Sequence, residues 1–322
     1  MKLPTLETLD RAAQLVHGVM PATPQICWPL LSQRVGAEVW VKHENHTQLG
    51  AFKIRGGLVY FEQLKRNQPT VTGVVAATRG NHGQSIAFAA KRAGLPTVIV
   101  VPHDNSLEKN AAMRGLGAEL IEHGSDFQDA FEHATQLAKE RRLHMVPSFD
   151  ASIVAGVASI YLELMRAVPN LDVVYVPVGM GSGICAAIAA RDALGLKTEI
   201  VGVCAAYAPA YAKSFAAKKV IEANVTPTIA DGMACRSPLA DAVEIMVRGA
   251  SRVLTVEEGE VRAAMRHLFT DTHNIAEGAG AAALAALLQE SVRIKGRKVA
   301  VIQTGGNVDR PVFAEVLSED SS

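Results

Sequence analysis

The chain has 322 residues, and its 32 lysines and arginines are balanced by 32 aspartates and glutamates. This length accommodates two domains or one large α/β domain, and the neutral balance provides no electrostatic footprint for nucleic acid or an anionic membrane. The expected partners are therefore small molecules and further copies of the chain, with no nucleic acid and no membrane.

Strand and helix patterns alternate along the chain. Short apolar or β-rich runs predict strands at residues 38–41, 73–77, 97–101, 118–122, 173–178, 199–204 and 299–304. Helical patterns, several of them closed by a glycine, follow at residues 83–94, 108–116, 126–141 and 183–194. Nearly continuous apolar strands between helices predict an α/β fold with parallel sheets covered on both faces.

The chain ends and the cysteines bear on the cellular compartment. No cationic head followed by an apolar stretch opens the chain, and the longest apolar run, residues 279–288, is shorter than the about 20 residues that span a bilayer. The cysteines form no CxxC pair, which disfavours zinc and disulfides: Cys27, Cys185, Cys204 and Cys235. We therefore expect a cytoplasmic protein.

Lys53 is the most informative single residue, and it lies in the run Ala51-Phe52-Lys53-Ile54-Arg55-Gly56-Gly57. An amine forms an imine with an aldehyde, and a desolvated lysine with a lowered pKa does so more readily. The ordinary alternative is a solvated lysine at the start of a helix. The lysine alone therefore decides little.

Two turns each follow a predicted strand and open a helix. The first has N–H groups that could bind a carboxylate, while Asn81 could either contact a ring oxygen or cap the helix; it comprises Thr78, Arg79, Gly80, Asn81 and His82. The second suits a phosphate, although it could be an ordinary tight turn; it comprises Gly179, Met180, Gly181, Ser182 and Gly183.

Two further candidates lie late in the chain. Thr304 ends the last predicted strand, where its hydroxyl could pair with a heterocycle nitrogen or merely belong to a turn that leaves the sheet. Glu277 is a lesser candidate, because an acid at the start of a helix is often satisfied by the helix dipole.

Together these motifs resemble the fold type II pyridoxal-phosphate enzymes, specifically the threonine/serine dehydratase and serine racemase group. AFKIRGG, TRGNHGQS, PVGMGSG and TGGNVD are similar to the family's SFKIRGA, SSGNHGQA or SAGNHAQG, PVGGGG and SGGNVD. Residues 230–232 are similar to its ADG segment, and the resemblance spans residues 5–316. It implies a tryptophan synthase β-like fold of two three-layer α/β/α domains, a large one (1–72 and 150–322) and a small one (73–149), in a homodimer or homotetramer.

The resemblance also implies roles in binding pyridoxal 5'-phosphate. Lys53 would hold the cofactor aldehyde as an imine and act as the base at Cα, with Phe52 and Glu277 nearby. Residues 179–183 would cradle the phosphate, Asn81 would pair with the ring hydroxyl, and Thr304 would face the pyridine nitrogen. Residues 78–82, together with Gly232, would receive the substrate. A hydroxyl at the ring nitrogen favours β-elimination over transamination, so the implied activity is that of an ammonia-lyase.

Three positions depart from the family pattern. Arg79 stands where racemases have a serine on the second cofactor face, which counts against racemisation, since arginine is not deprotonated in proteins. Ala205 and Tyr211 stand where cation-binding relatives have acids, so no divalent-metal site is expected there. Ala51 replaces the serine before Phe52, and we hypothesise that Arg79 senses the substrate or a closure of the domains.

The predicted reaction converts a 3-hydroxy amino acid to a 2-keto acid and ammonia. Threonine and serine are the default substrates, and 3-hydroxyaspartate or phenylserine are kept open because of Arg79. The alternatives are a β-replacement synthase of the same fold and a cofactor-binding protein without turnover.

Overall fold

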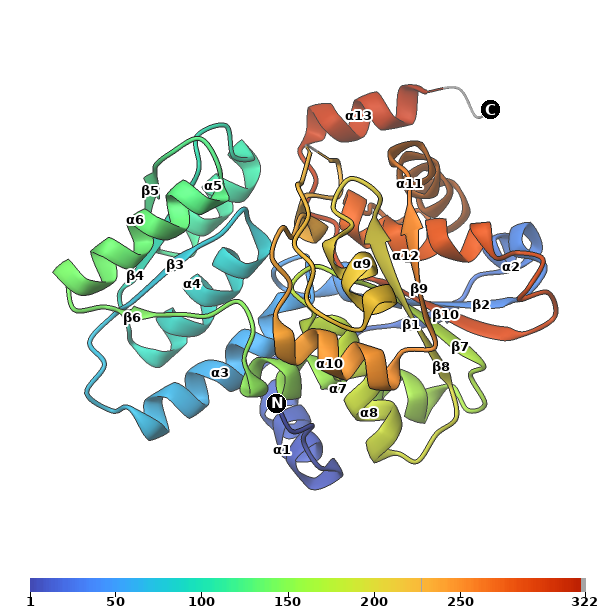
Figure 1. The fold of residues 1–322 in the computed structure, drawn as a ribbon, viewed down its shortest axis with the longest axis horizontal. Helices are drawn as coiled ribbons and strands as arrows, with labels where there is room; N and C mark the ends of the chain where they lie inside the picture. The colour runs from blue at the N-terminus through green and yellow to red at the C-terminus, as the bar shows by residue number, and fades with distance from the viewer. Residues whose placement is uncertain (227, 320–322) are drawn as a thin grey trace.

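A computed structural model describes residues 1–226 and 228–319 of the chain. Its framework is two separate sheets (Figure 1). The larger sheet has the order β1-β2-β10-β7-β8-β9; β1 runs antiparallel to β2, and the other neighbours are parallel. Its strands are β1 (Gln25–Cys27), β2 (Glu38–His43), β7 (Val173–Pro177), β8 (Glu199–Ala205), β9 (Arg252–Val256) and β10 (Lys298–Gln303).

The smaller sheet is parallel throughout and has the order β5-β4-β3-β6. Its strands are β3 (Val74–Ala77), β4 (Thr97–Val101), β5 (Glu119–Glu122) and β6 (His144–Met145). Every residue of β3 and β4 is buried, as it must be where helices cover both faces of a parallel sheet.

Helices surround both sheets, and α3 and α7 lie between them in Figure 1. The helices are α1 (Leu6–His17), α2 (Pro29–Val35), α3 (Lys53–Asn67), α4 (Asn81–Ala93), α5 (Leu107–Gly115), α6 (Phe127–Glu140), α7 (Ala151–Ala167), α8 (Ser182–Ala193), α9 (Ala210–Ala217), α10 (Ala240–Gly249), α11 (Glu258–Thr272), α12 (Gly278–Gln289) and α13 (Arg310–Ser318), with short 3-10 turns η1 (Glu44–His46) and η2 (Asp231–Met233).

The alternation of side chains along the strands divides the large sheet between two cores. Val174 and Val176 of β7 pack in one core with α1, α7, α8 and α10, whereas Val173 and Tyr175 pack in the other with α2, α11 and α12. The small sheet is covered in the same way, with α6 on one face and α3 and α4 on the other. The α/β fold of three-layer units with mostly parallel sheets is therefore confirmed.

The structure corrects several element boundaries. The fourth helix starts at Asn81, with Gly80 as its N-cap, so the alternative of Asn81 as the capping residue is wrong. The last strand ends at Gln303, which leaves Thr304 outside it. The apolar run at residues 279–288 belongs to α12, and no helix of the described residues is long and apolar enough to cross a bilayer.

Candidate functional site

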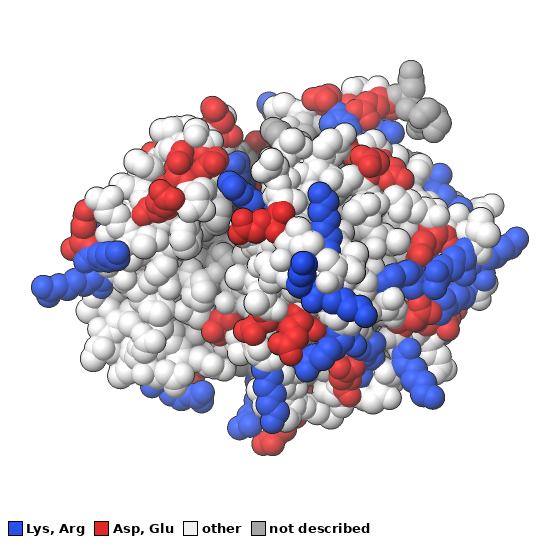
Figure 2. Space-filling view, in the orientation of Figure 1, with Lys and Arg blue, Asp and Glu red and all other residues white. Residues whose placement is uncertain are grey.

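A cleft opens where strands of both sheets end. Its empty volume is about 1030 Å³, and it is lined by residues from the carboxyl ends of β3, β7 and β10 and from the starts of α3, α4 and α8. This edge is where parallel α/β sheets usually bind ligands. All the predicted site residues lie together here: Phe52, Lys53, Thr78, Arg79, Gly80, Asn81, His82, Gly179, Met180, Gly181, Ser182, Gly183, Gly232, Glu277 and Thr304. On the face seen in Figure 2, lysines and arginines are interspersed with aspartates and glutamates.

Lys53 is the first residue of α3, and Phe52 is the N-cap of that helix. The Lys53 ammonium lies 4.7 Å from the centroid of the Phe52 ring. Burial lowers the pKa of Lys53 to about 8, although the Glu277 carboxylate opposes this shift. The lysine therefore has a substantial neutral fraction near physiological pH, and a neutral amine is the form that attacks an aldehyde.

The two glycines after Arg55 allow α3 to pack closely against its neighbours. A Cβ added to Gly56 would lie 2.8 Å from the Ile153 side chain of α7, and one added to Gly57 would lie 2.2 Å from the Ser85 hydroxyl of α4. That hydroxyl donates to the Lys53 carbonyl at 2.6 Å. The glycines thus serve close helix packing around Lys53.

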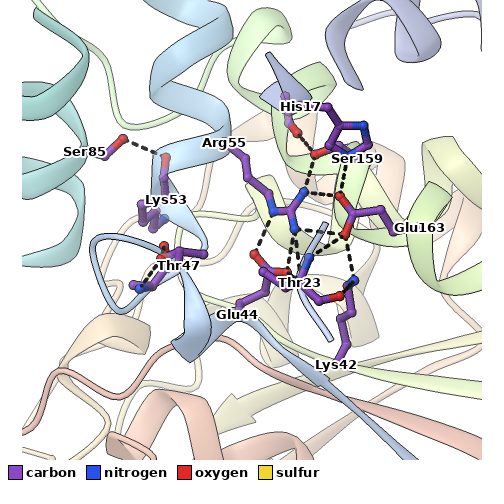
Figure 3. A network of polar contacts seen from close by, with 12 residues as sticks. His17, Thr23, Lys42, Glu44, Thr47, Lys53, Arg55, Ser85, Ser159 and Glu163 are labelled. Atoms are coloured by element: carbon purple, nitrogen blue, oxygen red, sulfur yellow. Dashed lines mark hydrogen bonds and ion pairs between the residues drawn. The ribbon is translucent and has the colours of Figure 1, made fainter. Parts of the chain in front are cut away.

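A buried cluster of charges holds the first turn of α3 (Figure 3). The Arg55 guanidinium is fully buried and donates to Glu44 at 2.7 Å and to Glu163 at 2.5 Å, while Lys42 donates to Glu163 at 2.7 Å. Burial raises the pKa of Glu163, but Arg55 and Lys42 outweigh it and lower that pKa to about 2. The two cations and two carboxylates therefore neutralise one another inside the protein.

The glycine loop, residues 179–183, connects β7 to α8. Gly181 is the N-cap of α8 and has a φ of 93°, a conformation that favours glycine. A Cβ at Gly179 would lie 2.5 Å from the Gly232 carbonyl oxygen. None of the five N–H groups of the loop has a backbone acceptor among residues 1–226 and 228–319. The loop thus presents unpaired donors at a helix N-terminus, which is the arrangement that binds phosphate.

Tyr211, on α9, supports the glycine loop from outside the cleft lining. Its buried hydroxyl donates to the Met180 carbonyl at 2.9 Å and accepts from the Leu239 N–H at 3.1 Å. Ala205 ends β8. In the part of the chain that the structure describes, there is no group of three or more His, Cys, Asp or Glu side chains that could hold a metal ion. At this position a hydroxyl, rather than a carboxylate, contacts the loop.

The substrate loop, residues 78–82, joins β3 to α4. The Thr78 hydroxyl accepts from the Gly80 N–H at 3.0 Å and from the Gly83 N–H at 3.3 Å, which fixes the loop from within. Among the described residues, no backbone acceptor is found for the N–H groups of residues 79, 81 and 82. These three donors suit a carboxylate.

His82 contributes a neutral ring to the cleft. Burial and the nearby Lys53 lower the pKa of His82 to about 3. Its Nε2 is buried and has no hydrogen-bond partner within the described parts of the chain. The ring is therefore a neutral polar group with one nitrogen left for a ligand.

A polar network joins the two sides of the cleft. Asn81 donates to Glu277 at 2.6 Å and accepts from Asn307 at 2.8 Å. Lys109 of α5 reaches across to Asp231 at 2.7 Å and to Glu277 at 3.5 Å. Burial raises the pKa of Glu277, and the Lys109 ammonium opposes that shift. Glu277 is the N-cap of α12 but makes no side-chain capping bond, so its carboxylate is directed to this network and not to the helix.

Thr304 and Gly232 complete the predicted set. Thr304 follows β10, and its carbonyl accepts from the Phe52 N–H at 3.0 Å, which ties the last strand to the residue before Lys53. Its hydroxyl makes no hydrogen bond to any residue that the structure describes, although the residue lines the cleft. Gly232 lies in η2, with its carbonyl against Gly179.

Sequence reasoning missed three contributors. Lys109 reads as an ordinary helix lysine, and its acidic partner Asp231 is 122 positions away in the chain. Phe127 lines the cleft from the start of α6 although its side chain is 38% exposed. Only the ADG segment, through Asp231, offered a sequence signal for any of these residues.

Comparisons with known proteins agree with this geometry. The family described as "Pyridoxal-phosphate dependent enzyme" matches residues 18–305. An L-threonine ammonia-lyase from Thermotoga maritima is 33% identical over 98% of this chain and 78% of its own length. An L-threo-3-hydroxyaspartate ammonia-lyase from Saccharomyces cerevisiae is 30% identical over 99% of this chain and 98% of its own.

A solved structure agrees as well. A threonine deaminase, given as that of T.th., superposes with a TM-score of 0.88 at 30% identity, over 95% of this chain and 99% of that one. The chain therefore belongs to the pyridoxal-phosphate dependent enzymes of fold type II, in their serine/threonine dehydratase group.

Proposed function

We propose that the protein is a pyridoxal-phosphate-dependent ammonia-lyase that converts a 3-hydroxy amino acid to a 2-keto acid and ammonia. The observation that carries this proposal is the meeting of Lys53, with its pKa lowered to about 8, and the unpaired glycine loop in one cleft. Relatives named as L-threonine and L-threo-3-hydroxyaspartate ammonia-lyases support the reaction class.

The residues of the cleft fit the cofactor. Gly179 and Gly181 leave a cradle that side chains would fill, because an added Cβ would lie 2.5 Å from the Gly232 carbonyl oxygen or 2.7 Å from the Ala242 Cβ. The N–H groups of the glycine loop would hold the phosphate. Asn81 retains a second N–H for the ring hydroxyl, and the Thr304 hydroxyl would face the ring nitrogen. Phe52 and Glu277 would flank Lys53.

Bound pyridoxal phosphate supplies an electron sink that makes the Cα proton of the amino acid acidic. In our proposal Lys53 removes that proton, because its neutral amine is well populated near pH 7. The resulting ammonium is then a proton source for the β-hydroxyl, which leaves as water. The released enamine hydrolyses to the keto acid and ammonia.

The protein side chains favour elimination over its competitors. The Thr304 hydroxyl is neutral and does not protonate a ring nitrogen as a carboxylate does, so the Cα electron pair is drawn less into the ring and is used to expel the β-hydroxyl. Arg79 has no proton to exchange at a physiological pH. Lys53 is thus the acid–base group at Cα, and proton return from a second face, which racemisation needs, has no obvious donor.

The substrate's α-carboxylate is assigned to the substrate loop. The unpaired N–H groups of residues 79, 81 and 82 lie at the start of α4, where the helix dipole adds to their attraction for an anion. Gly232 faces the same cleft.

We also propose a division of the chain into a large domain of residues 1–72 and 150–322 and a small domain of residues 73–149. The second sheet, whose strands span residues 74–145, supports the small domain. A homodimer or homotetramer is proposed on the resemblance alone, and size-exclusion chromatography with light scattering tests it.

Keto-acid release tests the function directly. The purified protein, loaded with pyridoxal phosphate, is incubated with L-threonine, L-serine, L-threo-3-hydroxyaspartate and L-threo-phenylserine, and the keto acid and ammonia are quantified, with Lys53→Ala as the control. The proposal requires release from at least one of them and none from the Lys53→Ala variant. Release from none, or a new cysteine-type product only when O-acetylserine and sulfide are supplied, would sink it.

A further inference from the structure

Arg79 is a cleft residue whose charge has no counterpart in the protein. It follows Thr78 in the substrate loop, two residues before α4, and its side chain is half-buried in the cleft wall. Across residues 1–226 and 228–319, no hydrogen bond or ion pair involves its guanidinium. A guanidinium stays protonated at all physiological pH values, so Arg79 holds a permanent positive charge in the cleft.

The other charged groups of the lining are already matched. Lys109 pairs with Asp231 at 2.7 Å and lies 3.5 Å from Glu277, so one cation faces two carboxylates in that network. Lys53 is reserved for the cofactor aldehyde in the proposed function, and the cofactor phosphate is assigned to the N–H groups of the glycine loop. Arg79 thus remains as a cation that awaits an anion from the ligand.

The α-carboxylate of the substrate does not need this guanidinium. Three main-chain N–H groups of the substrate loop are unpaired and are held in place by the Thr78 hydroxyl, so they already form a site for one carboxylate. The Arg79 side chain extends from the same loop, so the anion that it meets is a second one on the same ligand.

We infer that Arg79 selects a 3-hydroxy amino acid whose side chain ends in a carboxylate, with 3-hydroxyaspartate as the simplest member of this class. This inference rests on the proposed ammonia-lyase function. A planar guanidinium binds a carboxylate through two parallel, charge-assisted hydrogen bonds, which a methyl or phenyl side chain cannot accept. A neutral substrate instead buries the guanidinium without a partner.

The test compares substrates in variants that change only the guanidinium. kcat and KM are measured for L-threo-3-hydroxyaspartate and for L-threonine in the wild-type holoenzyme, Arg79→Gln, Arg79→Lys and Arg92→Gln. Arg92 is a matched control because it lies exposed at the far end of the same helix, α4. The absorbance of the bound cofactor in each variant reports whether the fold and the cofactor site are intact.

The inference requires a wild-type preference for the diacid and a fall in the ratio of kcat/KM values, 3-hydroxyaspartate over threonine, of on the order of tenfold to a hundredfold in Arg79→Gln. Most of the fall should lie in KM for the diacid, Arg79→Lys should recover part of it, and Arg92→Gln should keep the wild-type ratio. Malate, a dianion without the amine, should inhibit the wild type more strongly than Arg79→Gln.

Two results separate the possible failures. Keto acid from threonine with an unchanged ratio in Arg79→Gln overturns the role of Arg79 but leaves the ammonia-lyase function standing. Weakened cofactor binding in Arg79→Gln, with an unchanged ratio, would assign the guanidinium to the cofactor and equally overturn the inference. If no substrate yields keto acid in the wild type, the proposed function itself fails.

Discussion

The hydroxyl of Tyr211 donates to the carbonyl of Met180 at 2.9 Å, so a residue outside the cleft lining holds the middle of the glycine loop. The same hydroxyl accepts from the Leu239 N–H at 3.1 Å, just before α10 begins. One side chain thus connects three segments, β7–α8, α9 and α10, around the predicted phosphate site. The geometry of the loop depends on this hydroxyl as much as on the glycines.

Tyr211→Phe should therefore weaken cofactor binding. The substitution leaves a buried carbonyl and a buried N–H without partners, at about 1–3 kcal/mol for each unsatisfied group. We expect the dissociation constant of pyridoxal phosphate to rise by about tenfold, measured by absorbance titration of the apoenzyme. Tyr207→Phe is the control, because Tyr207 is 43% exposed. Equal affinities for the two variants would show that the hydroxyl does not hold the loop.

Gly179→Ala should disturb the same loop by steric conflict. The new Cβ would lie 2.5 Å from the backbone carbonyl of Gly232, which cannot rotate away as a side chain could. We expect cofactor affinity to fall by at least about tenfold. Gly259→Ala is the matched control, since no atom lies within 4 Å of an added Cβ there. If Gly179→Ala binds the cofactor as well as Gly259→Ala does, the assigned cradle is contradicted.

Much of this site could be predicted because its residues lie in short local motifs. Strands such as β4 and β7 are uninterrupted apolar runs, and the turns after them contain the residues that meet in the cleft. Helices α7 and α12 were not predicted, because they are buried on nearly all sides and show no polar face that would reveal a helical period.

The remaining features depend on contacts between distant parts of the chain. The Lys109–Asp231 pair and the Tyr211–Met180 bond join segments that no local pattern connects. The same holds for the pairing of Arg55 with Glu163, which is 108 positions away. Sequence patterns identify which residue types follow a strand, whereas the partner of a long side chain is decided by the tertiary fold.

The lowered pKa of Lys53 predicts how cofactor capture depends on pH. With a pKa of about 8, roughly a tenth of the lysine is neutral at pH 7, compared with under about 0.1% for an ordinary lysine. The rate at which apoenzyme recombines with pyridoxal phosphate should therefore rise with pH and level off above about pH 8. Stopped-flow absorbance measures this rate, and Lys53→Ala should show no imine absorbance at any pH.

Glu277 provides a second arm of that experiment. Its carboxylate raises the pKa of Lys53, so Glu277→Gln should move the midpoint of the rate profile to lower pH. A midpoint near the usual lysine value of 10.5 in the wild type would refute the desolvation of Lys53.

Arg55→Met should destabilise the protein strongly. It would leave Glu44 and Glu163 buried with Lys42 as the remaining cation, and removing one partner of a buried ion pair costs about 3–5 kcal/mol. Arg166→Met is the control, because Arg166 pairs with Asp10 at 2.8 Å on the surface, where such a pair contributes about 1 kcal/mol or less. Denaturant unfolding should rank the proteins as wild type, Arg55→Lys, then Arg55→Met. Similar midpoints for Arg55→Met and Arg166→Met would contradict the role of the cluster.

The pH dependence of the same variants tests the cause. Arg55 and Lys42 lower the pKa of Glu163 to about 2, against its usual 4.5, so the carboxylate stabilises the wild type above about pH 4.5 and this stabilisation is lost as the pH falls toward 2. In Arg55→Met the carboxylates lack that cation, and protonation relieves them. The difference in unfolding free energy between wild type and Arg55→Met should therefore shrink from pH 7 to pH 5, whereas a loss of packing alone would leave it constant.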